Sequence, residues 1–297
     1  MSESKRPVQE FTISDALWEK IEPLLPVREK KVHPLGCHRQ RVPDRQVLSG
    51  IFFLLRTGGQ WKSLDATGIC KGSTANSRFL EWLEAGFFAR LWEASLLDYD
   101  EMKGLDFEWM ALDGAMTKAP LGGEKKSGRN PCDRGKLGVK RSTLTEANGI
   151  VVGLAVEGAN RHDMKMVRET LDSMAPIIAA KREAFLFPDS PFEEEREVDL
   201  EAPVAESGLC LDAGYDYEEV REVAAEFGYT PHIRCRGEET KAKKEGQKAR
   251  RWVVERTHSW LNRFRRLLVR WDKKAACYLA FLHFACAILT WNKALFG

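Results

Sequence analysis

The segments W-M-A-L-D-G (Trp109–Gly114) and L-C-L-D-A-G-Y-D (Leu209–Asp216) decide the fold predicted for this sequence. In each segment a short apolar run, of the kind found in buried strands, leads directly to an acidic residue, Asp113 or Asp212. Burying or crowding a carboxylate costs roughly several kcal/mol unless a cation or hydrogen bonds compensate. We therefore expect two strands that each end in a functional acid.

A third acidic residue stands inside a basic helix. Glu255 lies within R-R-W-V-V-E-R-T-H-S-W-L-N-R-F-R-R-L (Arg250–Leu267) and is the only acid between Glu245 and Asp272. Three carboxylates that converge predict a divalent-metal site, because Mg²⁺ prefers oxygen ligands and paired ions can activate one oxygen and stabilise another. The alternative is that Glu255 is an internal salt-bridge partner of Arg251.

The charge of the chain is unevenly distributed. The net charge of +2 averages a basic block at 234–274, with 15 Lys and Arg against 5 Asp and Glu, and an acidic block at 183–206, with 1 against 9. The basic block is a candidate nucleic-acid face, which together with the three acids indicates metal-dependent phosphodiester chemistry on nucleic acid. The acidic block is expected to form a solvated insertion near 183–207.

The composition is that of a soluble globular protein, with 43% hydrophobic and 30% charged residues in 297 positions. Seven cysteines without a C-x-x-C pair and an N-terminus without an apolar signal region predict a cytoplasmic protein. The apolar segment Ala275–Trp291 is short for a membrane span and contains His283. We therefore expect a buried helix packed on a sheet, and no membrane partner.

Residues 1–104 are predicted to form a small all-helical domain. Ser14 is suited to cap a first helix, and Asp44 to begin a second one that stops at the Gly58-Gly59 pair. The periodicity changes after 98–107, which predicts a linker there and a second domain at 105–297.

The helical domain contains a candidate DNA-reading helix. A glycine-containing turn separates a short helix from one that begins near Ser73, which fits a helix-turn-helix, although other small helical bundles show the same punctuation. In such a motif the N-terminal residues of the second helix meet base edges. Asn76 and Arg78 are therefore predicted to contact DNA.

Residues 105–297 have the pattern of a mixed α/β sheet flanked by helices. Asn148-Gly149 is predicted to join strands at 138–146 and 150–157, because both residues tolerate positive φ in a hairpin turn. The loop at 121–137 is rich in Gly, Lys and Arg, and its Lys136 is a candidate contact to the phosphate backbone of DNA.

The polar side of the Glu255 helix is expected to face nucleic acid. Residues at three- and four-residue steps share that side: His258, Ser259, Asn262 and Arg266. Guanidinium groups bind phosphates well, so Arg251, Arg263 and Arg266 are predicted to contact phosphates beside the metal site.

Four motifs closely resemble the DDE transposases of bacterial insertion sequences, and most closely the group named after insertion sequence five. They are L-D-G-A-M-T-K (112–118), N-R-H-D-M (160–164), L-D-A-G-Y-D (211–216) and W-V-V-E-R-T-H-S-W-L-N-R-F-R-R-L-L-V-R-W (252–271). The resemblance runs from about Ile13 to Trp291. The helix that carries Glu255 is its most specific part.

This resemblance implies an α/β protein with an RNase H-like catalytic domain after a small helix-turn-helix-like domain. It implies Asp113, Asp212 and Glu255 as the catalytic, metal-binding triad, with Mg²⁺ as cofactor and Mn²⁺ able to substitute. The implied partners are double-stranded DNA, at terminal inverted repeats and at the target, and a second copy of the chain.

Two features of the family pattern need separate treatment. Neighbouring transposases carry a tyrosine before the arginine and a lysine after the glutamate, but here Lys248 and Asn262 stand at those positions, so neither role is transferred. His162 and Asp163 match a family feature with two open interpretations, a helix cap or a place at the rim of the active site. His258 is a third candidate rim residue.

The sequence therefore predicts a transposase that binds terminal inverted repeats, cleaves DNA with metal ions and joins the freed end to target DNA. One alternative is a domesticated DNA-binding protein without catalysis, which the intact Asp/Asp/Glu set disfavours. Another is a metal-dependent nuclease without strand transfer. Inverted repeats flanking the gene would distinguish the transposase from both.

Overall fold

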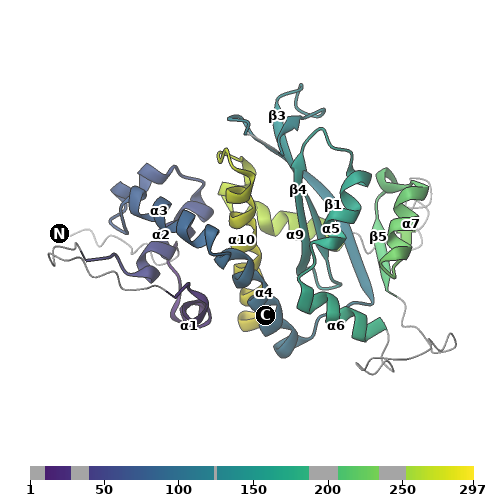
Figure 1. Ribbon diagram of the computed structural model, residues 1–297, viewed down its shortest axis with the longest axis horizontal. Coiled ribbons are helices and arrows are strands. Elements are labelled where there is room, and N and C mark those ends of the chain that lie inside the picture. The colour runs from purple at the N-terminus through teal and green to yellow at the C-terminus, as the bar shows by residue number, and fades with distance from the viewer. Residues whose placement is uncertain (1–10, 28–39, 124–125, 187–206, 234–251) are drawn as a thin grey trace, which may run out of the picture.

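A computed structural model describes residues 11–27, 40–123, 126–186, 207–233 and 252–297 of the chain. A helical region reaches to Lys103, and a mixed sheet with helices follows it (Figure 1). Most of the predicted acidic insertion lies outside the described residues, as does the part of the basic block before Trp252.

The helical region begins with elements whose ends follow from local sequence. Ser14 caps the first helix as predicted, because its hydroxyl accepts the N–H of Leu17. The second helix ends at Gly58, whose φ of +74° suits glycine. The bounds are α1 (Asp15–Ile21), η2 (Glu22–Leu24), α2 (Asp44–Thr57), η3 (Trp61–Ala66), α3 (Gly72–Glu84) and α4 (Phe87–Lys103). The linker expected at 98–107 is wrong in its first part, since α4 continues to Lys103.

The short helix η3, the turn that contains Gly68 and the helix α3 follow one another in the order that the sequence predicted for a helix-turn-helix. The start of α3 lies so close to η3 that a Cβ on Gly72 would stand 2.0 Å from the carbonyl oxygen of Trp61. The N–H of Gly72 also donates to Asp65 Oδ1 over 2.8 Å. Only glycine permits this contact without a shift of backbone, so Gly72 fixes how α3 leaves the turn.

The sheet has the strand order of an RNase H-like fold. Its bounds are β1 (Trp109–Lys118), β2 (Gly128–Arg129), β3 (Leu137–Thr145), β4 (Val151–Gly158), β5 (Gly208–Leu211) and β6 (Thr230–Ile233). The strands β4, β3 and β1 form an antiparallel meander, and β5 and then β6 extend it in parallel beyond β1. The short β2 pairs with the beginning of β3. The predicted hairpin between β3 and β4 is confirmed, with Gly149 at φ +87°.

Helices cover both faces of this sheet. They are η4 (Asp163–Met166), α5 (Val167–Asp172), α6 (Pro176–Leu186), η5 (Ala213–Tyr215), α7 (Glu218–Glu226), α9 (Trp252–Asn262), η6 (Arg265–Leu268) and α10 (Ala275–Phe296). Neighbouring residues of β3 point to opposite faces. Arg141 donates to Asn262 of α9 over 2.7 Å, whereas Ser142 accepts from Thr170 of α5 over 2.7 Å. The two helices therefore lie on opposite sides of the sheet.

The C-terminal helix α10 joins the two parts of the molecule (Figure 1). It contacts β4, as the sequence predicted, but its main partner is α4. Trp291 Nε1 donates to Asp98 Oδ2 over 2.7 Å, and the rings of Phe281 and Phe79 stack with centroids 4.6 Å apart. Within the described residues α10 alone is long and apolar enough to cross a membrane, but 67% of that stretch is buried inside the protein. The helix α10 is therefore a core helix of the protein.

Candidate active site

Asp113 and Asp212 lie on neighbouring parallel strands and on the same face of the sheet. The pairing of β1 with β5 sets Ala111 beside Cys210. Two residues further along each chain come the two acids, and a step of two returns a side chain to the same face. The register thus brings Asp113 and Asp212 side by side.

The two acids differ in their place along the strands. Asp212 directly follows β5, as predicted, but Asp113 lies inside β1, which continues to Lys118. The expected strand end at Asp113 is wrong because β1 goes on pairing with β3 after its pairing with β5 has ended.

The side chain of Asp212 is held by a hydrogen bond within the turn that follows it. Its Oδ1 accepts the N–H of Gly214 over 2.8 Å and so caps η5. A Cβ on Gly214 would stand 2.9 Å from the same oxygen, so glycine leaves the carboxylate room. The D-A-G sequence therefore holds the acid at the edge of the sheet.

The helix α9 delivers Glu255 to this edge. Val254 is fully buried and packs with Ala111 and Cys210, the paired residues that precede the two acids by two positions. The next residue of α9 is Glu255, which is exposed. The same face of the sheet thus carries all three predicted carboxylates, two from strands and one from the helix across them.

His258 belongs to the interior of this site. Its ring is buried, and its Nε2 lies 3.7 Å from Asp113 Oδ2. Burial, together with the nearby charge of Arg141, lowers the pKa of His258 to about 3, so the ring is neutral at physiological pH. The expectation that His258 shares the solvent-facing side of the helix is wrong, because the helix turns this position towards β1.

Asp163 lies beside Asp113. The sequence had left its role open between a helix cap and the rim of the active site. Its Oδ2 accepts from Lys140 Nζ over 2.9 Å, and Lys140 is almost fully buried on β3. Its Oδ1 lies where a side chain on Gly114 would be, 2.3 Å from an ideal Cβ there. A glycine directly after Asp113 is therefore what allows Asp163 to approach. The preceding residue, His162, fits the other interpretation, that of a helix cap. Its Nδ1 accepts from Met164 N over 3.4 Å and so caps η4.

Tyr215 is a member of this cluster that sequence reasoning missed. Its hydroxyl is buried, has no hydrogen-bond partner among the residues that the structure describes and lies 3.5 Å from the ideal Cβ of Gly114. Burial raises the pKa of Tyr215 well above its usual value, and the charges of Asp163, Asp113 and Asp212 raise it further. The sequence signal that could have revealed Tyr215 is its place in D-A-G-Y-D, three positions after Asp212.

Comparisons with known proteins match both parts of the chain. A family described as "Transposase DDE domain" matches residues 107–290, and one described as "Putative transposase of IS4/5 family" matches residues 13–92. The chain belongs to the DDE transposases. The resemblance predicted from the sequence motifs is thereby confirmed.

Relatives of this transposase come from an insertion element of Burkholderia cepacia. The "Putative transposase for insertion sequence element IS402" is 34% identical over 170 residues, which are 57% of this chain and 71% of that protein. The "Insertion element IS402 uncharacterized 16.2 kDa protein" is 37% identical over 120 residues, 40% of this chain and 80% of that protein.

Solved structures similar to the transposase are distant. The Mos1 mariner paired end complex with Mn covers 80% of both chains at 11% identity, with a TM-score of 0.28. A pre-cleavage Mos1 transpososome covers 81% of both chains at 11% identity, with a TM-score of 0.27.

DDE transposases use divalent metal ions, and the donor set of this one fits such ions. Asp113, Asp212 and Glu255 offer only oxygen ligands, which hard divalent cations prefer. Within the described part of the chain, no three acidic, His or Cys side chains lie close enough together to hold an ion. The chemistry of the three carboxylates therefore fits a divalent ion, whereas their side chains do not stand together as a metal site in this structure.

Two of the predicted DNA contacts are wrong, because the transposase buries both arginines. Arg78 pairs with Asp44, lies 3.6 Å from Glu81 and sits over the ring of Trp82. Its place inside the helical bundle excludes it from reading base edges.

Arg266 is buried at the contact between η6 and the helical region. It donates to the carbonyl oxygen of Gly59 and to Asp272, each over 2.9 Å, and packs over the ring of Phe281. The expectation placed it on the polar side of α9, but α9 ends at Asn262 and the chain then turns inwards.

The other predicted DNA contacts of the transposase lie where DNA can reach them, or outside the described part. Arg263 and Lys136 are exposed, and Asn76 is half-buried on α3. Arg251 lies outside the described residues, so its predicted phosphate contact stays a prediction.

Proposed function

We propose that this transposase binds the terminal inverted repeats of an insertion sequence, cleaves the DNA there and joins the freed 3′-hydroxyl to target DNA. Mg²⁺ is the proposed cofactor, with Mn²⁺ able to replace it, and Asp113, Asp212 and Glu255 are the proposed catalytic residues. Because two ends must be paired, the proposed working form on DNA is a homodimer.

One observation carries this proposal: acids from β1 and β5 stand side by side on the face that α9 crosses. Strands held in register by backbone hydrogen bonds keep two carboxylates at a fixed separation, and Val254 anchors α9 against both strands. Such rigidity matters because phosphoryl-transfer catalysis depends chiefly on positioning and on electrostatic stabilisation.

The roles of the residues follow from their charges. Asp113, Asp212 and Glu255 would hold divalent ions, which supply an activated oxygen nucleophile and stabilise the leaving oxygen. His258 is neutral and adds no positive charge beside Asp113. Lys140 is paired with Asp163, so its charge is directed to that acid.

The proposed division of labour gives end recognition to the helical region. With Arg78 buried, the accessible residues at the start of α3 are the candidates for base contacts, and Asn76 is the one we retain. Asparagine reads adenine through paired hydrogen bonds in the major groove. Changing Asn76 to Ala is expected to reduce the preference for element ends over scrambled duplexes by about 1–3 kcal/mol.

The experiment that tests the catalytic assignment uses Asp113→Asn, Asp212→Asn and Glu255→Gln, which remove one negative charge each at nearly constant shape. Cleavage of a duplex carrying the element end should fall by orders of magnitude in each variant, whereas binding of the same duplex without metal should persist. Asp216→Asn is the matched control, because Asp216 is an exposed acid that pairs with Arg221 on α7. Near-normal cleavage by one of the three variants would remove that residue from the triad.

The same assay separates the alternatives. A domesticated DNA-binding protein would bind the end and cut nothing, with or without Mg²⁺. A nuclease would release ends without joining them to a second duplex. Detection of joined products that depend on Asp113, Asp212 and Glu255 is the result that the proposed function requires.

A further inference from the structure

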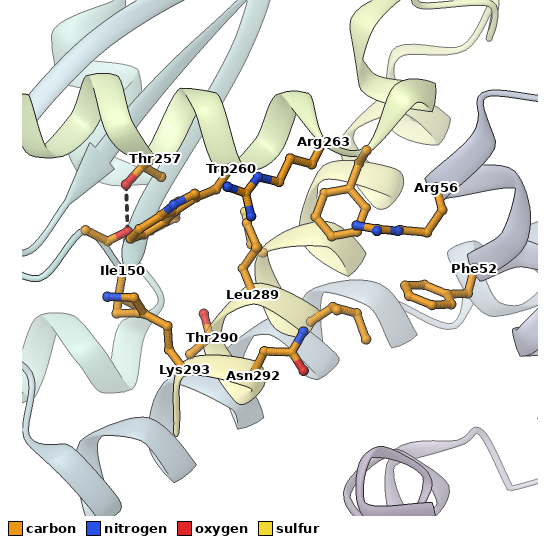
Figure 2. Close-up of a pocket in the computed structure, with 15 residues that line it drawn as sticks. Phe52, Arg56, Ile150, Thr257, Trp260, Arg263, Leu289, Thr290, Asn292 and Lys293 are labelled. Carbon is orange, nitrogen blue, oxygen red and sulfur yellow. Dashed lines mark hydrogen bonds between the residues drawn. The ribbon is translucent and has the colours of Figure 1, made fainter. Parts of the chain in front are cut away.

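A cleft of about 460 Å³ opens on the side of the molecule where the helical region meets the catalytic part (Figure 2). Its walls come from α2, from the β3–β4 turn and the start of β4, from α9 and the two residues after it, and from α10. Its volume lies within the range of about 300–1,000 Å³ that ligand sites occupy. The cleft is therefore large enough for a sugar and its phosphate.

Three cations line the cleft, each from a different element. Arg56 extends from α2, Arg263 follows α9 and Lys293 comes from α10, and in Figure 2 they are spread along the cleft with Arg263 between the other two. Neither Arg56 nor Arg263 has an ion-pair partner within the described part of the chain. Their charge is thus available to an anion.

Aromatic rings hold two of these cations in place. The guanidinium of Arg56 lies 5.4 Å from the ring centre of Phe264, and Lys293 Nζ lies 4.7 Å from that of Trp260. A guanidinium stacked on a ring keeps its N–H donors free at the edge. Lys293 also donates to the carbonyl oxygen of Asn148 over 3.2 Å, which uses one of its three protons.

No acidic residue lines the cleft among the residues that the structure describes. Glu146, whose charge acts on Lys293, is fully buried and accepts the backbone N–H groups of Asn148 and Ile150 over 2.9 and 2.8 Å. These N–H donors stabilise the negative charge of Glu146, and its buried oxygens do not line the cleft. The lining is therefore selective for anions.

The cleft is separate from the three carboxylates. Thr257 and Trp260 line it, and they follow Glu255 on α9 by two and five positions. At about 100° per residue these positions lie roughly 200° and 140° around the helix from Glu255. The cleft and the predicted active site therefore use different sides of α9.

We propose that this cleft binds the phosphate backbone of DNA at a second position, away from the bond that is cut. The proposal rests on the proposed function only in taking DNA as the polyanion. Successive phosphates of a backbone lying along the cleft would be contacted by Arg56 from the helical region and by Arg263 and Lys293 from the catalytic part at once. DNA held in this way would fix how the end bound by the helical region is presented to the carboxylates.

The test measures binding of a duplex of unrelated sequence in EDTA, by fluorescence anisotropy over a range of KCl concentrations. The variants are Arg56→Gln, Arg263→Gln and their combination. Each lost phosphate contact should lower the slope of log affinity against log salt by about 0.9, so the double variant should lose roughly twice as much as each single one. Thermal unfolding of each variant verifies that the fold is kept.

The matched control is Arg221→Gln, which removes one positive charge on α7, a helix that lies at the opposite end of the molecule from α2 in Figure 1 and contributes no residue to the cleft lining. The control should keep the wild-type slope. A wild-type slope in the double variant overturns the proposal, and so does an equal loss in the control, which would indicate a general charge effect. Cleavage of an end-bearing duplex by the wild type is measured separately, so absent catalysis and absent cleft binding give different results.

Discussion

Lys140 and Asp163 form an ion pair of 2.9 Å in which the lysine is almost fully buried and the aspartate is half exposed. The Lys140 Nζ also donates to the carbonyl oxygen of Arg161 over 2.8 Å. A buried ammonium is costly without a counter-charge, so this pair fixes Asp163 against Gly114 and next to Asp113.

Asp163→Asn should therefore destabilise the transposase more than loss of an ordinary surface pair. The variant leaves the buried Lys140 without its counter-charge, and we expect a loss of about 1–3 kcal/mol in the free energy of unfolding. The measurement is urea denaturation followed by circular dichroism. Glu219→Gln breaks the exposed pair with Lys165 and should cost about 0–1 kcal/mol. Equal losses in the two variants would contradict the structural role given to Lys140.

Tyr215→Phe should separate stability from function. The hydroxyl of Tyr215 is buried without a hydrogen-bond partner in the described part of the chain, so its removal should leave stability unchanged or raise it by about 1 kcal/mol. Because the same hydroxyl faces the acids of the site, we expect cleavage of an end-bearing duplex to fall. Tyr229→Phe is the control, since Tyr229 also has a buried, unpartnered hydroxyl but packs on Arg182. Cleavage that is equal in both variants would show that the Tyr215 hydroxyl has no part in the site.

The stability of the protein should fall in mild acid, in part through His283. Its ring stacks on Trp92 at 5.0 Å, and burial lowers its pKa to about 4. The unfolded chain, with an ordinary histidine pKa of about 6.5, binds the proton first, so stability is lost as pH falls from about 6.5 to 4. The contribution is about 3 kcal/mol, since the pKa is lowered by about 2.5 and each pKa unit corresponds to about 1.36 kcal/mol.

His283→Gln should remove that part of the pH dependence, because glutamine does not titrate. The measurement is urea denaturation of both proteins at several pH values between neutral and pH 4. The difference between them isolates His283 from His258, which is also neutral and buried. Parallel pH profiles for the two proteins would contradict the assignment.

The sequence predicted those parts of the fold whose signals are local. Asn148-Gly149 specifies its hairpin and Ser14 its helix cap, and the apolar runs before Asp113 and Asp212 specify two strands. These features depend on a few adjacent residues, so no knowledge of distant partners is needed.

The parts that it did not predict depend on partners far apart in the chain. Arg266 is buried because Gly59 and Phe281 meet it from two other elements, and a single helical period cannot reveal this. Tyr215 joins the site only because η5 turns its ring under Asp113, which is about a hundred residues earlier. For this reason Arg266 was wrongly assigned to the DNA-facing side of the helix, and Tyr215 was overlooked.

The packing of α10 on the helical region leads to a prediction about the stability of the full chain. Phe281 is fully buried and stacks on Phe79 of α3, so Phe281→Ala should lower the free energy of unfolding by about 3–5 kcal/mol. Phe296→Ala, at the exposed end of the same helix, should change it by less than about 0.5 kcal/mol.

A fragment of residues 1–104 lacks α10 altogether and leaves the apolar faces of α3 and α4 uncovered. We expect it to show no cooperative urea transition, whereas the full chain unfolds with one. Recognition of element ends should then be measured in the full chain carrying Glu255→Gln, which keeps α10 in place. A sharp transition in the fragment, at a denaturant concentration close to that of the full chain, would show that the helical region folds without α10.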